Sequence, residues 1–249
     1  MQPPRAPIHP LLAGEQPLPK ELGSYLVKVL RLRAGDRFVL FDPEARTEAN
    51  AELIRDVPTV ARVAEVRPAA RSTARDVSLL QGLAKGDKPD HILRAAVALG
   101  ATHVTFVRTE RSMPGAELRE ERLRAVMLDT ARQCERGDLP ELAPLSNLEG
   151  ALQASDGLGI LLDPNAEQSL VELLRVVAPS QALALAVGPE GGFSERETHR
   201  LLAAGFQPVR LAPFVLRTEL AAVAALAVVA AHAGVETHVA AGEPQRSDR

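Results

Sequence analysis

The stretch from Ala182 to Ala231 constrains the fold of this chain more than any other part. It opens with the continuous apolar run ALALAV, which leads directly into Gly188-Pro189-Glu190-Gly191-Gly192. An unbroken apolar run of this length is typical of a strand that is covered on both faces. Ser194 and Glu197 have the spacing of a capping box, so we predict a helix from Ser194 to Gly205. A glycine-rich loop is therefore expected between the end of a strand and the start of a helix.

The same arrangement then repeats further along the chain. Phe206 to Leu211 is predicted as a second strand, a loop with Pro213 follows, and Arg217 precedes another helix with Thr218 as a candidate N-cap. Glycine-rich loops at strand ends leave backbone amides free to meet a ligand, so the two loops are expected to converge on one pocket beside Arg217. The GPEGG loop by itself is equally compatible with a tight strand-to-helix turn that binds no ligand. It matches neither GxGxxG nor GxxxxGK[ST].

The predicted helix after Glu219 has no polar residue from Leu220 to Ala231. A helix without a polar face has to be buried against other elements or against another subunit. It is too short to cross a bilayer, which requires about 20 apolar residues. Its many alanines allow close helix approach, and we therefore favour a dimer interface over a purely internal core.

Composition narrows the class of protein. The chain has 249 residues, 46% of them apolar, which is enough for a sizeable core in one large or two ordinary domains. The single Cys134 excludes a disulfide framework and a cysteine-based metal site, and the six histidines show no ligand spacing. We therefore expect no metal. The N-terminus has no apolar signal core, so the cytoplasm is the expected compartment.

Charge is distributed unevenly around a net value of −3. Residues 1–75 carry twelve Lys and Arg against nine Asp and Glu, whereas the remainder is acidic. This excess predicts a phosphate-facing patch in the N-terminal part, with an ordinary solvated surface as the alternative. The candidate patch consists of Arg5, Lys20, Lys28, Arg31, Arg33 and Arg37.

The spacing of predicted elements divides the chain in two. Residues 21–30 read as a short helix, and three closely spaced strands follow at 37–41, 49–54 and 60–66, which favours a small β-barrel. From Asp76 onward strands alternate with helices, which predicts a mainly parallel sheet. The predicted strands of this part are 77–80, 102–107 and 158–162, the helices are 88–99, 116–134 and 167–177, and 139–145 is expected to be irregular.

Six motifs in this order resemble one known family. They are VLRLRAGDRFVLFD (29–42), KGDK (85–88), TERS (109–112), ARQCERGDLPEL (131–142), VGPEGGFS (187–194) and LAPFVLRTE (211–219). Together they resemble the RsmE family, the 16S ribosomal RNA uridine N3-methyltransferases of the SPOUT class. The likeness spans most of the chain apart from roughly 43–75, 143–157 and the tail.

The resemblance implies an α/β protein in which a PUA-like small β-barrel, residues 1–71, precedes a SPOUT methyltransferase domain, residues 72–235. A C-terminal trefoil knot is expected over about 158–233, and the polar tail 236–249 is expected to be disordered. Family membership also implies an obligate homodimer, S-adenosylmethionine as cofactor, and the small ribosomal subunit as partner.

The resemblance and the charge pattern together give the candidate site residues. Arg217, Glu219 and Glu190 are the catalytic candidates; Glu219 and Glu190 are candidate proton acceptors, with a structural role at a helix terminus or loop as the alternative. RNA contacts are expected at Arg5, Arg31 and Arg33 of the basic patch and at Lys85, Arg111, Arg132 and Gln133, with ordinary helix surface as the alternative for Arg132 and Gln133. The implied cofactor site consists of Leu162, Asp163, Val187, Gly188, Pro189, Glu190, Gly191, Gly192, Leu211, Val215, Leu216 and Arg217.

The sequence departs from the family pattern at Pro89, Arg132, Ala212 and Leu220. Ala212 and Leu220 affect the expected detail of the pocket and not the class. Two other functions remain open: a SPOUT methyltransferase that acts on another RNA such as transfer RNA, and a non-catalytic RNA-binding homologue. The GPEGG loop with Arg217 and Glu219 weighs against the second.

Overall fold

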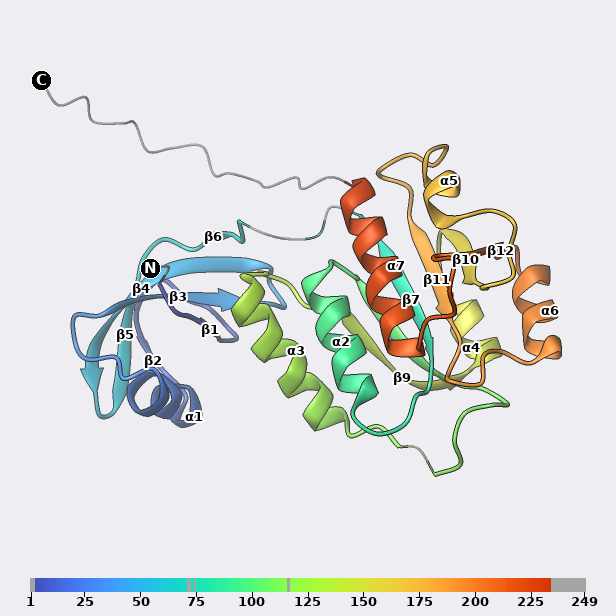
Figure 1. The fold of residues 1–249 in the computed structure, drawn as a ribbon. Helices are drawn as coiled ribbons and strands as arrows, with labels where there is room; N and C mark the ends of the chain where they lie inside the picture. Colours follow the sequence, from blue (N-terminus) through green and yellow to red (C-terminus); the bar gives the residue numbers. More distant parts are fainter. Residues whose placement is uncertain (1–2, 71–72, 74, 116, 234–249) are drawn as a thin grey trace, which may run out of the picture. The chain divides into compact units, whose positions relative to one another are not determined.

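The computed structural model describes residues 3–70, 73, 75–115 and 117–233, and the tail predicted to be disordered lies outside them. The chain divides into two compact units, an N-terminal unit up to Ser72 and a C-terminal unit over Thr73–Val235 (Figure 1). Each unit has its own sheet, and each is described separately below.

The N-terminal unit is built on a six-stranded sheet with the order β1-β3-β4-β5-β2, in which β6 also pairs with β4. Its pairings are antiparallel except for β1 with β3. The helix expected at 21–30 is present, although α1 gives way to a π-helical turn, η1, in its second half. The bounds are β1 Arg5–Pro7, β2 Gly14–Pro17, α1 Lys20–Ser24, η1 Tyr25–Val29, β3 Arg37–Asp42, β4 Thr47–Asp56, β5 Thr59–Val63 and β6 Arg67–Pro68.

Alternating inward side chains of these strands form the core of the N-terminal unit. Phe38, Leu40 and Leu53 are almost completely buried there, and Leu26 of η1 joins them. Phe38 and Leu40 are two positions apart and so lie on the same face of β3, although this strand is buried at five of its six positions. The predicted linker at 67–75 is in part a strand, because β6 pairs with the start of β4.

The C-terminal unit contains a six-stranded sheet with the order β12-β10-β11-β7-β8-β9, and every pairing in it is parallel. This confirms the predicted parallel sheet. The central strand β11 is buried at all five positions, as its unbroken apolar sequence predicts. The bounds are β7 Val77–Gly82, β8 His103–Arg108, β9 Glu141–Asn147, β10 Leu158–Leu162, β11 Leu183–Val187 and β12 Gln207–Val209.

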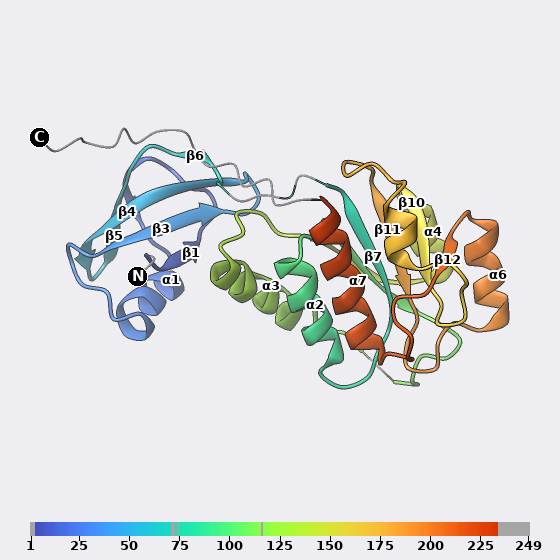
Figure 2. The same cartoon turned by 45° about the horizontal axis from the view of Figure 1, so that its top comes forward.

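Helices cover both faces of this sheet (Figures 1 and 2). On one face α2 packs between α3 and α7, and α7 also contacts β11. On the other face α4 and α6 bury Leu148, Ala151 and Leu201 against the strands. The short α5 contacts α7. The bounds are α2 Lys88–Ala98, α3 Glu120–Cys134, α4 Leu148–Gln153, α5 Leu170–Leu174, α6 Glu195–Ala203 and α7 Thr218–Ala233.

Three element predictions were wrong in detail. The segment expected to be irregular, 139–145, instead contains the edge strand β9. An edge strand tolerates proline, and the pairing with β8 is irregular where Pro144 interrupts it. The helix expected from 116 begins only at Glu120, and the helix expected over 167–177 shrinks to α5 with a Ser169–Glu172 capping box.

A buried ion pair explains part of the ARQCERGDLPEL motif. Arg136 donates to Asp138 at 2.7 Å and to the carbonyl oxygens of Val97 and Ala101 at 2.9 and 2.8 Å. The Thr73 hydroxyl donates to the same aspartate at 3.0 Å. These bonds satisfy carbonyl groups around the end of α2, so the motif has a structural role at this point.

Candidate functional site

A pocket of about 340 Å³ opens where the loops after β10, β11 and β12 meet. In a parallel sheet the carboxyl ends of the strands share one edge, and ligands collect there. The volume lies within the range of about 300–1,000 Å³ that small-molecule sites occupy. Its lining consists of Leu162, Asp163, Pro164, Val187, Gly188, Pro189, Glu190, Gly192, Val209, Leu211, Ala212, Phe214, Val215, Leu216, Arg217, Thr218 and Ala221.

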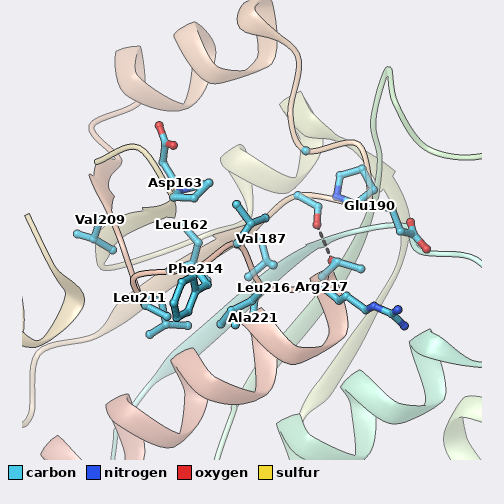
Figure 3. A pocket seen from close by; sticks show the side chains of 17 residues that line it. Leu162, Asp163, Val187, Glu190, Val209, Leu211, Phe214, Leu216, Arg217 and Ala221 are labelled. Atoms are coloured by element: carbon cyan, nitrogen blue, oxygen red, sulfur yellow. Dashed lines mark hydrogen bonds between the residues drawn. The ribbon is translucent and has the colours of Figure 1, made fainter. Parts of the chain in front are cut away.

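The two ends of the pocket differ in character (Figure 3). Val209, Leu211 and Phe214 lie on one side of the pocket, where the Asp163 carboxylate also lies, whereas Glu190 and Arg217 lie on the other side. Phe214 is 80% exposed, so its ring is available to a flat ligand group. One end can therefore bury an apolar or aromatic group while the other presents charge.

The glycine loop needs its glycines because backbone packs on backbone. A Cβ at Gly188 would lie 2.9 Å from the Cα of Gly192, and a Cβ at Gly82 would collide with Pro189. Gly192 adopts φ +69°, a conformation that favours glycine. The loop is thus folded tightly enough for main-chain atoms to line the pocket.

Thr218 fixes this loop from α7. Its hydroxyl donates to the carbonyl oxygen of Gly188 at 2.6 Å (Figure 3) and accepts from Nε2 of the buried Gln81 at 2.9 Å. Thr218 was predicted as the N-cap of this helix. It is instead the first helical residue, and Arg217, whose carbonyl oxygen accepts from the amide of Ala221, occupies the N-cap position. The bond to Gly188 thereby joins the start of the helix to the glycine loop.

The TERS segment, residues 109–112, follows β8 and is hydrogen-bonded to α6 and to the glycine loop. Glu197 of α6 accepts from the backbone amides of Glu110 at 2.8 Å and Ser194 at 2.9 Å, the latter bond belonging to the predicted capping box. Arg111 donates to the carbonyl oxygen of Gly191 at 2.9 Å. Gly191, which is also predicted to contact the cofactor, is not among the residues that line the pocket, and a Cβ there would lie 3.1 Å from the Cβ of Arg111.

A charged cluster, which we call the mouth cluster, joins Lys88, Glu190 and Glu219. The Lys88 ammonium lies 2.7 Å from Oε1 of Glu190 and 3.4 Å from Oε2 of Glu219. The hydrogen bond to Glu190 raises the pKa of Lys88. Burial opposes the charge of Glu190, but hydrogen bonds from Lys88 and from backbone amides outweigh burial and lower the pKa of this carboxyl. Both groups are therefore ionised at neutral pH.

Lys88 was not among the residues predicted for the site. It belongs to the KGDK motif, which was the signal that could have found it. Its partners Glu190 and Glu219 are 102 and 131 positions away in the chain, so the pattern of neighbouring residues could not predict these ion pairs.

The residues expected to contact RNA fall into two groups. Arg31, Arg33, Lys85, Arg111 and Gln133 are exposed. Arg132 is mostly buried and lies 3.6 Å from Asp129. Arg5 does not fit the expectation, because its side chain is only 11% exposed, pairs with Glu48 at 2.9 Å and stacks over Phe41.

Two further features bear on the type of site. Within the described parts of the chain, no group of three or more His, Cys, Asp or Glu side chains has the arrangement of a metal site. No helix among those residues is long and apolar enough to cross a membrane.

Comparison with known proteins identifies the family. A family model for an RNA methyltransferase domain matches residues 71–230, and a model for an RNA methyltransferase PUA domain matches residues 18–56. A ribosomal RNA small subunit methyltransferase E from Synechocystis is 31% identical over 211 residues, which cover 82% of this chain and 69% of that relative. This chain belongs to the RsmE family of RNA methyltransferases. The corresponding protein of Bacillus subtilis is 26% identical over 82% of this chain and 85% of its own length.

Solved structures of RsmE-like proteins share the fold. A methyltransferase from Legionella pneumophila with bound S-adenosylmethionine superposes with a TM-score of 0.82 at 26% identity, covering 93% of this chain and 98% of its own. Methyltransferase E from Neisseria gonorrhoeae, also bound to S-adenosylmethionine, gives 0.81 at 27% identity over 91% and 96%. These likenesses confirm the predicted PUA-like domain followed by a SPOUT-type α/β domain.

Proposed function

We propose that this protein transfers the methyl group of S-adenosylmethionine to N3 of a uridine in 16S ribosomal RNA. The observation that carries the proposal is the pocket at three strand ends, which has an apolar end, a backbone-lined glycine loop and Arg217 with the mouth cluster at its rim. RsmE relatives named as small-subunit ribosomal RNA methyltransferases match both units of the chain. A ribosomal RNA substrate also agrees with a cytoplasmic location.

The residues that line the pocket match the chemical groups of S-adenosylmethionine. Val209, Leu211 and Phe214 would hold the adenine ring of the cofactor, and backbone groups around Gly188 would hydrogen-bond its polar edges. When bound, the cofactor supplies a methyl group whose bond to the sulfonium sulfur breaks as the bond to N3 forms, which leaves S-adenosylhomocysteine.

The protein has two tasks at the acceptor. Uracil N3 carries a proton at neutral pH, so a base has to take it, and the negative charge that develops on the uracil carbonyls needs stabilisation. Arg217 cannot act as a base, but its guanidinium can donate to O2 or O4 or to an adjacent phosphate. Glu219 and Glu190 are the candidate proton acceptors.

The remaining RNA contacts are assigned to the exposed cations. Arg31 and Arg33 in the N-terminal unit, and Lys85 and Arg111 beside the pocket, are available to phosphate. Gln133 and Arg132 on α3 are retained as RNA contacts. Arg5 is left out because Glu48 and Phe41 already hold its guanidinium.

We also infer that the active form is a homodimer that uses α7. Ala222, Ala225, Leu226 and Val229 bury one face of this helix inside the subunit, but Leu220 is 51% exposed and the opposite face is apolar as well. Phe214 and Val215 extend this exposed apolar surface from the pocket loop. A second copy of the chain would cover it. Light scattering at micromolar concentration tests this, and a particle of 26.6 kDa would contradict it.

A trefoil knot over about 158–233 is part of the same proposal. Strand β10 lies between β12 and β11, and the chain returns from β12 to place α7 against β11 and α2. This support is topological, and cofactor-bound crystals of the protein would provide the test.

Nucleosides of ribosomal RNA from a strain that lacks the gene test the proposal as a whole. We expect one N3-methyluridine to be missing from 16S ribosomal RNA and to return with the wild-type gene. Loss of a methyl group from transfer RNA instead would favour the other SPOUT function. Unchanged nucleosides in both RNAs would favour a non-catalytic RNA-binding protein.

A further inference from the structure

Gln81 is a polar side chain without any exposed surface, near the end of the interior strand β7. Its amide nitrogen donates to two oxygen atoms at 2.9 Å, the carbonyl of Gly82 and the hydroxyl of Thr218. Its amide oxygen, Oε1, is buried and has no hydrogen-bond partner among the described residues. A buried acceptor without a donor is costly, so the arrangement of this side chain calls for an explanation.

The neighbours of the Gln81 amide dictate its orientation. The Gly82 carbonyl can only accept a hydrogen bond, so the nitrogen of the amide has to face it. The Thr218 hydroxyl has a single proton, which it donates to the Gly188 carbonyl at 2.6 Å. The hydroxyl oxygen therefore accepts from Gln81. These hydrogen bonds form a relay from Gln81 through Thr218 to Gly188, which we call the Gln81 relay.

The Gln81 relay ends on the glycine loop of the pocket. Gly188 and Thr218 line the pocket, whereas Gln81 does not. Gly188 is followed by Pro189, which has no N–H, so the Gly188 carbonyl is the only hydrogen-bonding group of the peptide bond that joins them. A hydrogen bond to this carbonyl is thus the means by which the protein can hold that peptide bond in one orientation. The loop takes its course along the pocket from there.

We propose that Gln81 is a positioning residue for S-adenosylmethionine, which acts through Thr218 on the Gly188 carbonyl and keeps the glycine loop in the shape that receives the cofactor. The inference rests on the proposed function, because it takes S-adenosylmethionine as the ligand of this pocket. A hydrogen bond donated to a hydroxyl oxygen polarises the hydroxyl and strengthens the bond that the hydroxyl donates in turn. Gln81 directs both of its N–H groups at oxygen atoms, which leaves its own oxygen without a donor.

Cofactor affinity of the full chain, measured by calorimetry, gives the first test. Thr218→Val removes the hydroxyl at nearly constant volume and should weaken binding about tenfold, whereas Gln81→Met should weaken it about threefold. Thr218→Ser retains the hydroxyl and should bind within about twofold of wild type. The double variant Gln81→Met/Thr218→Val should bind as Thr218→Val does, because Gln81 acts only through the hydroxyl.

Gln153→Met, at an exposed position of α4, is the control for loss of an amide and should bind as wild type does. Additive losses in the double variant would show that Gln81 contributes by packing and would overturn the proposal. Wild-type affinity in Thr218→Val would overturn it as well.

Carbonyl carbon NMR of the free protein tests the relay without cofactor or RNA. Gly188-Pro189 is the only Gly-Pro pair in the sequence, so isotope labels at the carbonyl carbon of glycine and the nitrogen of proline together mark this one carbonyl. Its resonance should move upfield in Thr218→Val, where the hydrogen bond is lost, and by less in Gln81→Met, where the bond is weakened. It should stay in place in Thr218→Ser and Gln153→Met.

An unmoved carbonyl resonance in Thr218→Val or in Gln81→Met would overturn the proposal even if affinity fell. If the wild-type protein binds no S-adenosylmethionine, the proposed function and the role of Gln81 both fail. If it binds the cofactor and the resonance does not move, only the role of Gln81 fails.

Discussion

Two clusters of three charged side chains among the described residues have opposite stoichiometry. In the N-terminal unit one carboxylate, Glu48, pairs with two cations, Arg5 at 2.9 Å and Arg67 at 3.3 Å. In the C-terminal unit one cation, Lys88, pairs with two carboxylates. The first cluster lies on the paired strands β1, β4 and β6, and the second lies on loop ends around a pocket.

Burial shows what this difference means. Glu48 is 3% exposed and both of its oxygens are paired with arginines, so its carboxylate has no acceptor position left for a ligand, although Nε of Arg5 is buried without a hydrogen-bond partner among the described residues. The mouth cluster is 20–30% exposed and includes a carboxylate oxygen without a hydrogen-bond donor among the described residues. A partly exposed cluster of charges beside a pocket is thus a better candidate for function than a buried cluster within a sheet.

The largest effect is expected beside the mouth cluster. Arg217→Ala should lower the single-turnover methylation rate by a factor on the order of 10² or more, because one charge-stabilising donor at the reacting group is lost. Cofactor affinity, measured by calorimetry, should stay within a few fold. Arg217→Lys should recover only part of the rate, since a point charge does not reproduce the guanidinium fork. Arg200→Ala, an exposed cation on α6, serves as the control, and a wild-type rate in Arg217→Ala would contradict the assignment.

The strand cluster should respond in stability and not in rate. Glu48→Gln leaves two cations without their carboxylate, so the free energy of unfolding should fall by about 1–3 kcal/mol. Chemical denaturation measures this, with Glu15→Gln as the control because its pair with Arg62 at 3.8 Å is exposed and should contribute under about 1 kcal/mol. Unchanged stability in Glu48→Gln would show that the burial of this cluster has no energetic consequence.

The pH dependence of the free energy of unfolding should show whether the charge of Glu190 contributes to stability. The folded pKa of Glu190 is lowered from its ordinary value of 4.5, so its stabilisation is complete above that value and is lost as the pH falls through the folded pKa. Glu190→Gln should therefore destabilise the protein by under about 1 kcal/mol at pH 7, a modest figure because the group is partly solvated. The difference should shrink below about pH 4. Thermal unfolding of both proteins across pH measures it, and a difference that grows toward acid would have the wrong sign.

The smallest effect is expected at the exposed cations of the N-terminal unit. Replacing both Arg31 and Arg33 by alanine should weaken RNA binding a few fold and reduce the salt dependence of the binding constant by about one to two in its logarithmic slope. Arg62→Ala, which lies in an exposed pair, is the control. Equal slopes for the variant and the wild type would remove these arginines from the RNA-binding surface.

The pattern of neighbouring residues was sufficient to predict the strands, loops and helix that form the pocket. The apolar run and the capping box at Ser194 predicted β11, the glycine loop and α6, because strand burial and helix capping are set by neighbouring residues. Residues around the second loop, Leu211 to Arg217, follow β12 as the repeat of this arrangement predicted.

Contacts between segments that are distant in the sequence could not be predicted from the pattern of neighbouring residues. Arg5 has the composition of a phosphate-binding residue, and only the pairing of β1 with β3 and of β3 with β4 brings it to Glu48. Strand β9 was missed because Pro144 within it and Pro140 just before it indicate a loop, whereas an edge strand accepts proline. The hydrogen bond from Arg111 to the carbonyl oxygen of Gly191 joins residues 80 positions apart, and local pattern did not predict it.

Transfer by the purified protein tests the central claim most directly. Small ribosomal subunits from a strain lacking the gene would be incubated with wild-type protein and isotopically labelled S-adenosylmethionine, and the digested 16S ribosomal RNA would be analysed by mass spectrometry. The account predicts one labelled N3-methyluridine per subunit, formed at a rate that Arg217→Ala reduces on the order of 10²-fold. A label on another base, on a ribose, or on no nucleoside would contradict it.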